Sequence, residues 1–387
     1  MKPEELKSKR TGTLRKNPTG YWSFVPNPLP PDLKFSVATI RLLSEAQRQL
    51  GELSGMVGAG RIFPNPYFLI QPAIHKEAVL SSRIEGTRSG LDDLFFFEAA
   101  PEEAAKHPDV REVHNHVLAM EYGLERLKTL PVSLRLILEI HGKLMDGVRG
   151  GQTNPGEFRW SQNWIGAPGA SLTEATYVPP PVEEMQKCLS DLEKYLHADP
   201  ESPELIRIAL MHSQFEMIHP FTDGNGRVGR LLISMLLVHW GLLPYPLLYL
   251  SAFFEKYRSE YYRHLLAVSH EGKWEEWVDF FLRGVREQAK DACATGVELL
   301  DMRTEYRKLL ERKKASKTAL AVLEHLFSNP VISIPFIRDE WEVTFPTAQK
   351  AIDSLEENGI LSETTGKRRN RTWIAKGILK VMNGRDS

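Results

Sequence analysis

One twelve-residue stretch, from His219 to Arg230, constrains the fold more than any other part of the sequence. It reads His-Pro-Phe-Thr-Asp-Gly-Asn-Gly-Arg-Val-Gly-Arg and passes directly into the largely apolar run 231–240. A helix that begins here presents unpaired backbone N–H groups and a partial positive charge. Gly224 and Gly226 let the backbone approach a phosphate closely, and the two arginines, three positions apart, are expected on one helix face. The stretch therefore predicts a nucleotide phosphate site at the start of a buried helix.

Two titratable side chains accompany these glycines and arginines. His219 can accept a proton from a hydroxyl near neutral pH, although a lone histidine near a helix end is more often structural. Asp223 could cap the next turn, or it could hold Mg²⁺ together with substrate phosphates. The Asp-Gly-Asn-Gly run also resembles a calcium loop, but it lacks the alternating acids and the late glutamate of that motif. The context favours a general base beside a magnesium nucleotide.

The composition describes an ordinary soluble protein of two or three domains. The chain has 387 residues, 42% of them hydrophobic and 26% charged, with a formal net charge of -1, which gives no global nucleic-acid signal. The two cysteines, Cys188 and Cys293, lie far apart, which argues against disulfides and a structural zinc site. The polar start shows no secretory signal and no run is long enough to span a membrane, so a cytoplasmic location without membrane partners is expected.

Apolar periodicity predicts a mainly α body. Residues 1–35, rich in proline, are expected to form an extended arm, and 150–181 to form loops with a small β-hairpin. Helices are expected near 35–53, 67–87, 91–100, 110–129, 132–148, 182–197, 203–218, 227–240, 257–270 and 274–296.

The C-terminal part has a different character. A charged helical linker is expected at 299–316, followed by a winged helix-turn-helix over 317–387, with three helices and then two short strands. The tip between those strands carries Lys367, Arg368, Arg369 and Arg371, which could follow a DNA backbone. The third helix carries Asp353, Glu356 and Glu357, which would repel phosphates. DNA binding and protein docking therefore both stay open for this domain.

The stretch His219–Arg230 resembles the signature of the Fic (filamentation induced by cAMP) family at every defining position. The resemblance extends to residues 155–159, 178–180 and 83–87, and covers roughly 40–295. It implies a Fic-type helical bundle with a small β-hairpin flap. We therefore expect five parts: the arm at 1–35, an N-terminal helical region at 36–105, a catalytic core at 106–298, the helical linker at 299–316 and the winged helix-turn-helix at 317–387.

Most Fic proteins transfer AMP from ATP to a hydroxyl side chain of a target protein. The resemblance implies that His219 is the base that deprotonates the acceptor and that Asp223 holds Mg²⁺ at the phosphates. It also implies a nucleotide-binding set, made of the anion hole, the phosphate-holding arginines with the residues between them, and two tyrosines near adenine and ribose: Gly224, Asn225, Gly226, Arg227, Val228, Gly229, Arg230, Tyr261 and Tyr262. The flap that docks the target backbone would be Glu174, Ala175, Thr176 and Tyr177.

The run from Ser81 to Gly86 matches the inhibitory motif of the same family. Glu85 would pair with Arg230 in the place of the γ-phosphate, so the chain resembles the class that inhibits itself in cis. The expected activity is protein adenylyltransferase. The alternatives are transfer of another phosphate-containing group, removal of AMP, or a nucleotide-sensing transcriptional regulator that acts through the winged helix. A homodimer is expected because family members often pair, although no sequence feature fixes an interface.

Overall fold

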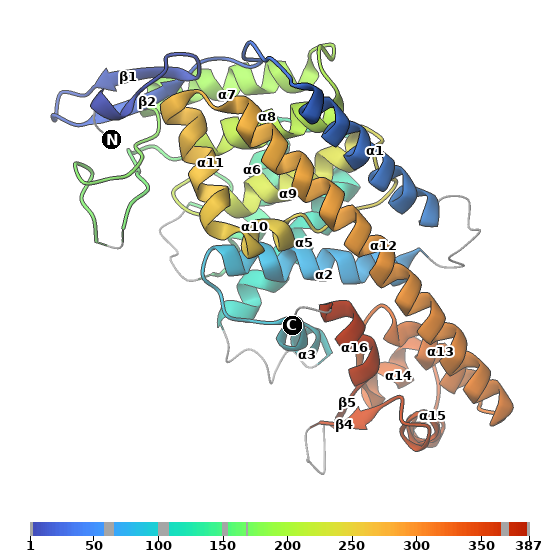
Figure 1. The fold of residues 1–387 in the computed structure, drawn as a ribbon. Coiled ribbons are helices and arrows are strands. Elements are labelled where there is room, and N and C mark those ends of the chain that lie inside the picture. The colour runs from blue at the N-terminus through green and yellow to red at the C-terminus, as the bar shows by residue number, and fades with distance from the viewer. Residues whose placement is uncertain are drawn as a thin grey trace.

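The computed structural model describes residues 3–57, 66–99, 108–148, 154–167, 169–364 and 371–384, and it confirms a mainly helical fold (Figure 1). Within these ranges, every helix is too short or too polar to cross a lipid bilayer. The helices of the body are α1 (Val37–Val57), α2 (Tyr67–Ile84), α3 (Leu91–Ala99), α5 (Pro108–Arg126), α6 (Leu134–Leu144), α7 (Val182–His197), α8 (Glu204–Ile218), α9 (Asn225–His239), α10 (Ser251–Lys256), α11 (Arg258–Glu271) and α12 (Trp274–Arg312).

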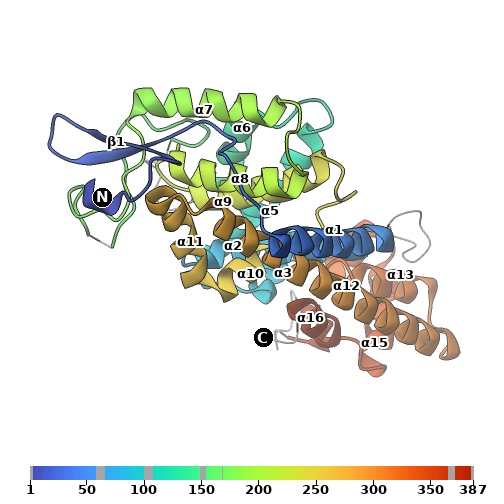
Figure 2. The same cartoon turned by 45° about the horizontal axis from the view of Figure 1, so that its top comes forward.

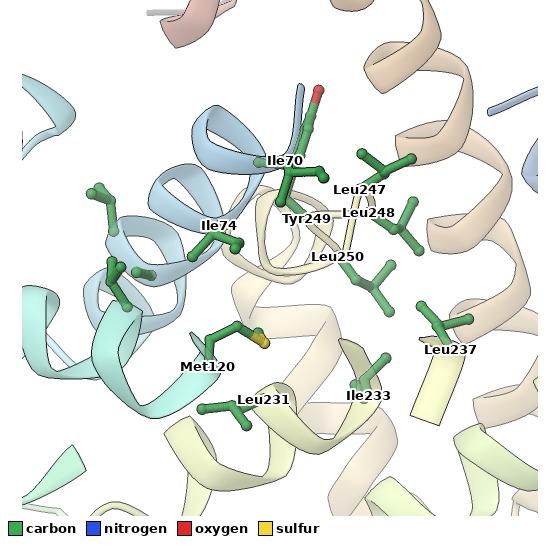
Figure 3. Packing of buried hydrophobic residues seen from close by; sticks show 14 of the residues in the cluster. Ile70, Ile74, Met120, Leu231, Ile233, Leu237, Leu247, Leu248, Tyr249 and Leu250 are labelled. Atoms are coloured by element: carbon green, nitrogen blue, oxygen red, sulfur yellow. The ribbon is translucent and has the colours of Figure 1, made fainter. Parts of the chain in front are cut away.

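Helices α8 and α9 form the centre of the body. Nearly every residue of both helices is buried, because their sequences are apolar around the whole circumference rather than along one stripe. Helices α2, α5 and α6 pack on α9, and α7, α11 and α12 pack on α8. Apolar side chains of α2, α5 and α9 meet in this core, among them Ile74, Met120 and Leu231 (Figure 3). The loop between α8 and α9 is therefore held by buried helices on both sides.

Helix α12 runs without a break for 39 residues, so the end expected near residue 296 is wrong, while the helical character expected from residue 299 is confirmed as far as Arg312. Helix α1 lies along its first part (Figure 2). No proline interrupts the stretch, and Gly296 is retained inside the helix because a Cβ there would lie 2.9 Å from the Met56 side chain and 3.3 Å from that of Leu69. The expected linker at 299–316 is thus mostly the second half of a helix that carries the C-terminal unit.

The N-terminal segment is more ordered than an extended arm. After a short 3-10 helix (Pro3–Glu5), strands β1 (Gly12–Lys16) and β2 (Trp22–Pro26) pair antiparallel as a hairpin. Phe24 of β2 is fully buried, and its backbone N–H donates to Val178 O over 2.8 Å. Prolines excluded a helix here, but they did not exclude a hairpin that packs on the segment before α7.

The expected β-hairpin before α7 is reduced to one antiparallel bridge. Ile165 and Tyr177 exchange both backbone hydrogen bonds, at 2.9 and 3.1 Å, and no named strand forms among the described residues from 154 to 181. The Tyr177 ring is buried and its hydroxyl donates to Met217 O over 2.8 Å. One side of this loop is therefore anchored to α8.

The C-terminal unit packs against α2 and α3 as well as α12 (Figure 1). Its sheet has the order β3-β5-β4, with both pairs antiparallel, and the sequence did not predict β3 or the last helix. Asn329 donates to Glu98 of α3 over 3.3 Å, which ties this unit to the body. The expected basic tip at 367–369 lies outside the described residues. The elements are α13 (Lys317–Leu326), β3 (Val331–Ser333), α14 (Ile334–Glu340), α15 (Phe345–Glu357), β4 (Ser362–Glu363), β5 (Thr372–Ile374) and α16 (Lys376–Asn383).

Candidate active site

The loop between α8 and α9 turns sharply around a buried phenylalanine. His219 ends α8 in the left-handed region, with φ 48° and ψ 60°, and Gly224 takes φ 80° immediately before α9. The Asn225 side chain closes the turn, since it accepts from Phe221 N and donates to Phe221 O, both over 2.8 Å. The expected phosphate loop is thus a fixed turn that leads into the start of α9, where the first N–H groups of a helix have no intrahelical partner.

His219 is held as a neutral base. Its Nδ1 lies 3.3 Å from the backbone O of Glu216, and because a carbonyl only accepts, Nδ1 carries the proton and Nε2 is the basic nitrogen. Burial lowers the pKa of His219 to about 4, and the nearby Arg159 adds to this, against the backbone hydrogen bond and two carboxylates. Arg159 Nε also donates to His219 O over 3.0 Å, which fixes the backbone of the residue.

A cavity of about 610 Å³ opens beside this histidine. Its volume is in the range of small-molecule sites. Its wall includes the expected base His219, Gly226 of the glycine loop and the second arginine, Arg230. It also includes Thr176 and Tyr177 of the flap, the aromatic residues Tyr261 and Tyr262, and Glu85 at the end of α2. Residues from four separate segments of the sequence therefore share one cavity.

Arg230 is fully engaged with the end of α2. Its Nη2 donates to Glu85 Oε1 over 2.6 Å and to Ser81 O over 3.0 Å, while Nε donates to Ser81 Oγ over 3.0 Å. Burial alone would raise the pKa of Glu85, but the charge and hydrogen bond of Arg230 outweigh it and the net shift is downward. A Cβ at Gly226 would collide with Glu85 Oε1, so the carboxylate lies directly against the glycine loop. Glu85 thus occupies the position of an anion.

Arg227 does not share the surroundings of Arg230, although a common face was expected. Its Nη1 lies 3.1 Å from Glu112 of α5 and its Nη2 lies 3.5 Å from Asp223 Oδ2. The Asp223 side chain is half exposed, and its Oδ1 accepts from Gly224 N over 2.6 Å. Arg227 does not line the cavity that Arg230 lines. The two guanidinium groups separate because each follows a different carboxylate.

The two tyrosines after α10 differ in exposure. Tyr261 is 1% exposed and lies 2.8 Å, through its hydroxyl, from His212 Nε2, whereas Tyr262 is 43% exposed. Both line the cavity. In the expected flap, Thr176 and Tyr177 line the cavity, while the Glu174 carboxylate accepts from Ser171 and turns away into the loop.

Two models of one known family match the part of the chain that carries this geometry. Residues 40–125 match the model described as Fic/DOC family N-terminal, and residues 131–237 match the model described as Fic/DOC family. Over these two ranges the chain belongs to the Fic/DOC family. The first match contains Ser81 and Glu85, and the second contains the whole stretch from His219 to Arg230.

Two curated relatives of this Fic/DOC chain are both named "Protein adenylyltransferase Fic". The one from Drosophila grimshawi is 31% identical over 178 residues, and the one from Drosophila virilis is 30% identical over 177 residues. Each alignment covers 43% of this chain and 32% of the relative, so the chain spans about a third of the curated relatives' length. A Fic family protein from Desulfovibrio desulfuricans has the same fold, with a TM-score of 0.58 and 19% identity over 90% of this chain and 99% of that one.

Sequence reasoning missed four side chains around this Fic/DOC site. Glu112 pairs with Arg227, Arg159 fixes the backbone of His219, and Glu216 lines the cavity one turn before that histidine. His141 stacks on the Phe221 ring with centroids 3.7 Å apart and accepts from Gly156 N over 3.0 Å. Glu216 carried a signal, because it lies three residues before the expected base and would share its side of α8, and Arg159 belonged to the segment 155–159 that resembles the family.

Proposed function

We propose that this chain is a protein adenylyltransferase that transfers AMP from ATP to a Ser, Thr or Tyr hydroxyl of a target protein. The observation that carries the proposal is one cavity that holds a neutral imidazole, a glycine loop at a helix start and Arg230. The names of the relatives support the same reaction class.

In the proposed reaction, His219 Nε2 accepts the proton of the acceptor hydroxyl. The backbone N–H groups of Asn225 and Gly226 would face the α-phosphate, joined by that of Gly224 once it leaves Asp223 Oδ1, and Arg230 would meet the terminal phosphates. Fixed donors of this kind stabilise charge as it develops on the phosphate. The exposed edge of the flap loop would pair with the target backbone.

Magnesium fits the residues at this site. Asp223 offers a half-exposed carboxylate beside the glycine loop, and Mg²⁺ is often held by one carboxylate plus substrate phosphates. Among the described residues no cluster of three or more His, Cys, Asp or Glu forms an all-protein metal site. When bound, the ion would neutralise charge on the phosphates.

We further propose that Glu85 inhibits the chain in cis. Its carboxylate holds the guanidinium that the γ-phosphate would need, and it lies against the glycine loop. Two anions cannot occupy this place together, so ATP would bind in an unproductive pose until the end of α2 withdraws.

The test uses ATP labelled at the α-phosphorus. Glu85→Gly is expected to bind label covalently, to itself or to a target, at a rate well above that of the wild type. Glu85→Gly with His219→Ala should lose the label while keeping its fold by circular dichroism. Equal labelling with and without His219 would refute the proposed role of the histidine.

For the C-terminal unit we propose a winged helix-turn-helix, supported by α13, α14 and α15 with the antiparallel sheet that follows. Titration with a mixed-sequence DNA duplex at low and high salt distinguishes its two uses. DNA binding through the basic tip should weaken steeply with salt. No binding at low salt would leave protein docking as the role.

A further inference from the structure

Glu216 is a carboxyl group that the proposed reaction does not use. It lies in α8 one turn before His219 and lines the same cavity. Its Oε1 is buried and has no hydrogen-bond partner among the described residues, whereas Oε2 lies 4.0 Å from His219 Nδ1. A buried carboxyl oxygen without a partner is costly, so its retention calls for a reason.

The neighbouring helix makes room for this carboxyl group. A Cβ at position 229 of α9 would lie 2.7 Å from Glu216 Oε1, and Gly229 has none. Any other residue at 229 would force the carboxyl group to move. The Gly229 backbone therefore sets the place of Glu216 between α8 and α9.

Several charged groups face Glu216 and His219. Around Glu216, Arg230 of α9 lowers the carboxyl pKa and Glu85 of α2 raises it, yet burial is the largest influence and the pKa rises to about 7. Tyr261 of α11 lies close enough for its own pKa to be raised by the charge of Glu216. Glu216 therefore changes its charge near neutral pH.

Other groups face the histidine itself. Arg159, from the loop before α7, lowers the pKa of His219 after burial, while Glu85 and Asp223 raise it. Because the pKa of His219 is about 4, the imidazole is already neutral when Glu216 loses its proton. The two titrations are therefore separable in pH.

We propose that Glu216 is the positioning residue of His219: its backbone O holds the Nδ1–H tautomer, and its carboxylate, 4.0 Å from Nδ1, stabilises the imidazolium formed during transfer. The inference rests on the proposed function. The acceptor O–H proton passes to Nε2, the acceptor oxygen bonds to the α-phosphorus, and the bond to pyrophosphate breaks with its electron pair leaving on pyrophosphate. The imidazolium then returns the proton to solvent. Glu216 touches none of the reacting atoms and acts through the ring it faces.

The kinetic test compares Glu85→Gly with Glu85→Gly carrying Glu216→Gln. At about pH 8, we expect kcat of Glu85→Gly to exceed that of the double variant by about tenfold or more, with KM for ATP unchanged. The ratio should shrink toward one as the pH falls and Glu216 becomes protonated, at a pH below that of the wild type because Glu85 no longer raises the Glu216 pKa. Glu216→Asp keeps the charge and should retain part of this pH dependence.

Two kinetic results would overturn the inference. A purely structural role would lower kcat of the Gln variant by the same factor at every pH. A role in repelling phosphate would lower KM for ATP and leave kcat unchanged.

A second test needs neither activity nor a Glu216 variant. In ¹³C-histidine NMR of the wild-type chain, the His219 C2–H resonance, assigned with His219→Gln, should shift through a transition near pH 7 as Glu216 ionises. Absence of this transition would refute the coupling. A transition in the wild type together with no AMP transfer by Glu85→Gly would show that the proposed function fails while the pairing of Glu216 with His219 stands.

Discussion

Substitution of Glu85 probes the contact that closes the cavity. Glu85→Gly removes the 2.6 Å bond to Arg230 and leaves the two contacts of Arg230 to Ser81 in place. A hydrogen bond to a charged group contributes about 1.5–3 kcal/mol. Because the Glu85 side chain is 36% exposed, solvent screening reduces this to about 1–2 kcal/mol. Because about 1.4 kcal/mol corresponds to a tenfold change in rate, the labelling rate should rise roughly 5–30-fold.

The assay is covalent labelling from α-labelled ATP under initial-rate conditions, together with ATP affinity by calorimetry. Glu125→Gly is the matched control, because Glu125 also ends a helix but pairs with Lys128 at a side-chain exposure of 71%. We expect the labelling rate to rise for Glu85→Gly and to stay unchanged for Glu125→Gly. Equal rates for the wild type and Glu85→Gly, with both chains folded and ATP bound, would refute the competition between Glu85 and phosphate.

Three further predictions follow from the same geometry. Ser81→Ala removes the 3.0 Å bond to Arg230 Nε and should raise labelling less than Glu85→Gly does; a larger rise would contradict the primary role of Glu85. Asn225→Ala leaves both polar groups of Phe221 without their partner and should lower the unfolding free energy by about 2–4 kcal/mol in urea titration. Burial lowers the pKa of His116 to about 3, so between about pH 6.5 and 3 the unfolded chain binds more protons and acid favours unfolding. The wild type should therefore lose stability relative to His116→Gln by up to about 1.4 kcal/mol per pH unit in that window, and a pH-independent difference would contradict this.

The local features of the site could be predicted from the sequence because they depend on neighbouring residues. The glycines, the apolar run and the histidine fix a helix end, a turn and a helix start within twelve positions. The contact of Arg230 with Glu85 spans 145 residues and followed only from the resemblance to a family. Periodicity carries no information about which helix brings its end to a given arginine.

Other features could not be predicted from the sequence because they depend on contacts between residues that are far apart in the chain. Arg227 and Arg230 lie three residues apart, but Glu112 and Glu85, from two different helices, draw their long side chains apart. The β1–β2 hairpin forms because two strands pair with each other, and the prolines in this segment kept those strands from being recognised in the sequence. The continuation of α12 past residue 296 depends on the missing side chain of Gly296, which admits Met56.

The most direct test of the account uses parallel reactions of Glu85→Gly with α-labelled and γ-labelled ATP. The account predicts protein-bound label from the α-phosphorus alone, lost when His219→Ala is added. Retention of the γ-label on protein, or α-label that does not depend on His219, would contradict it.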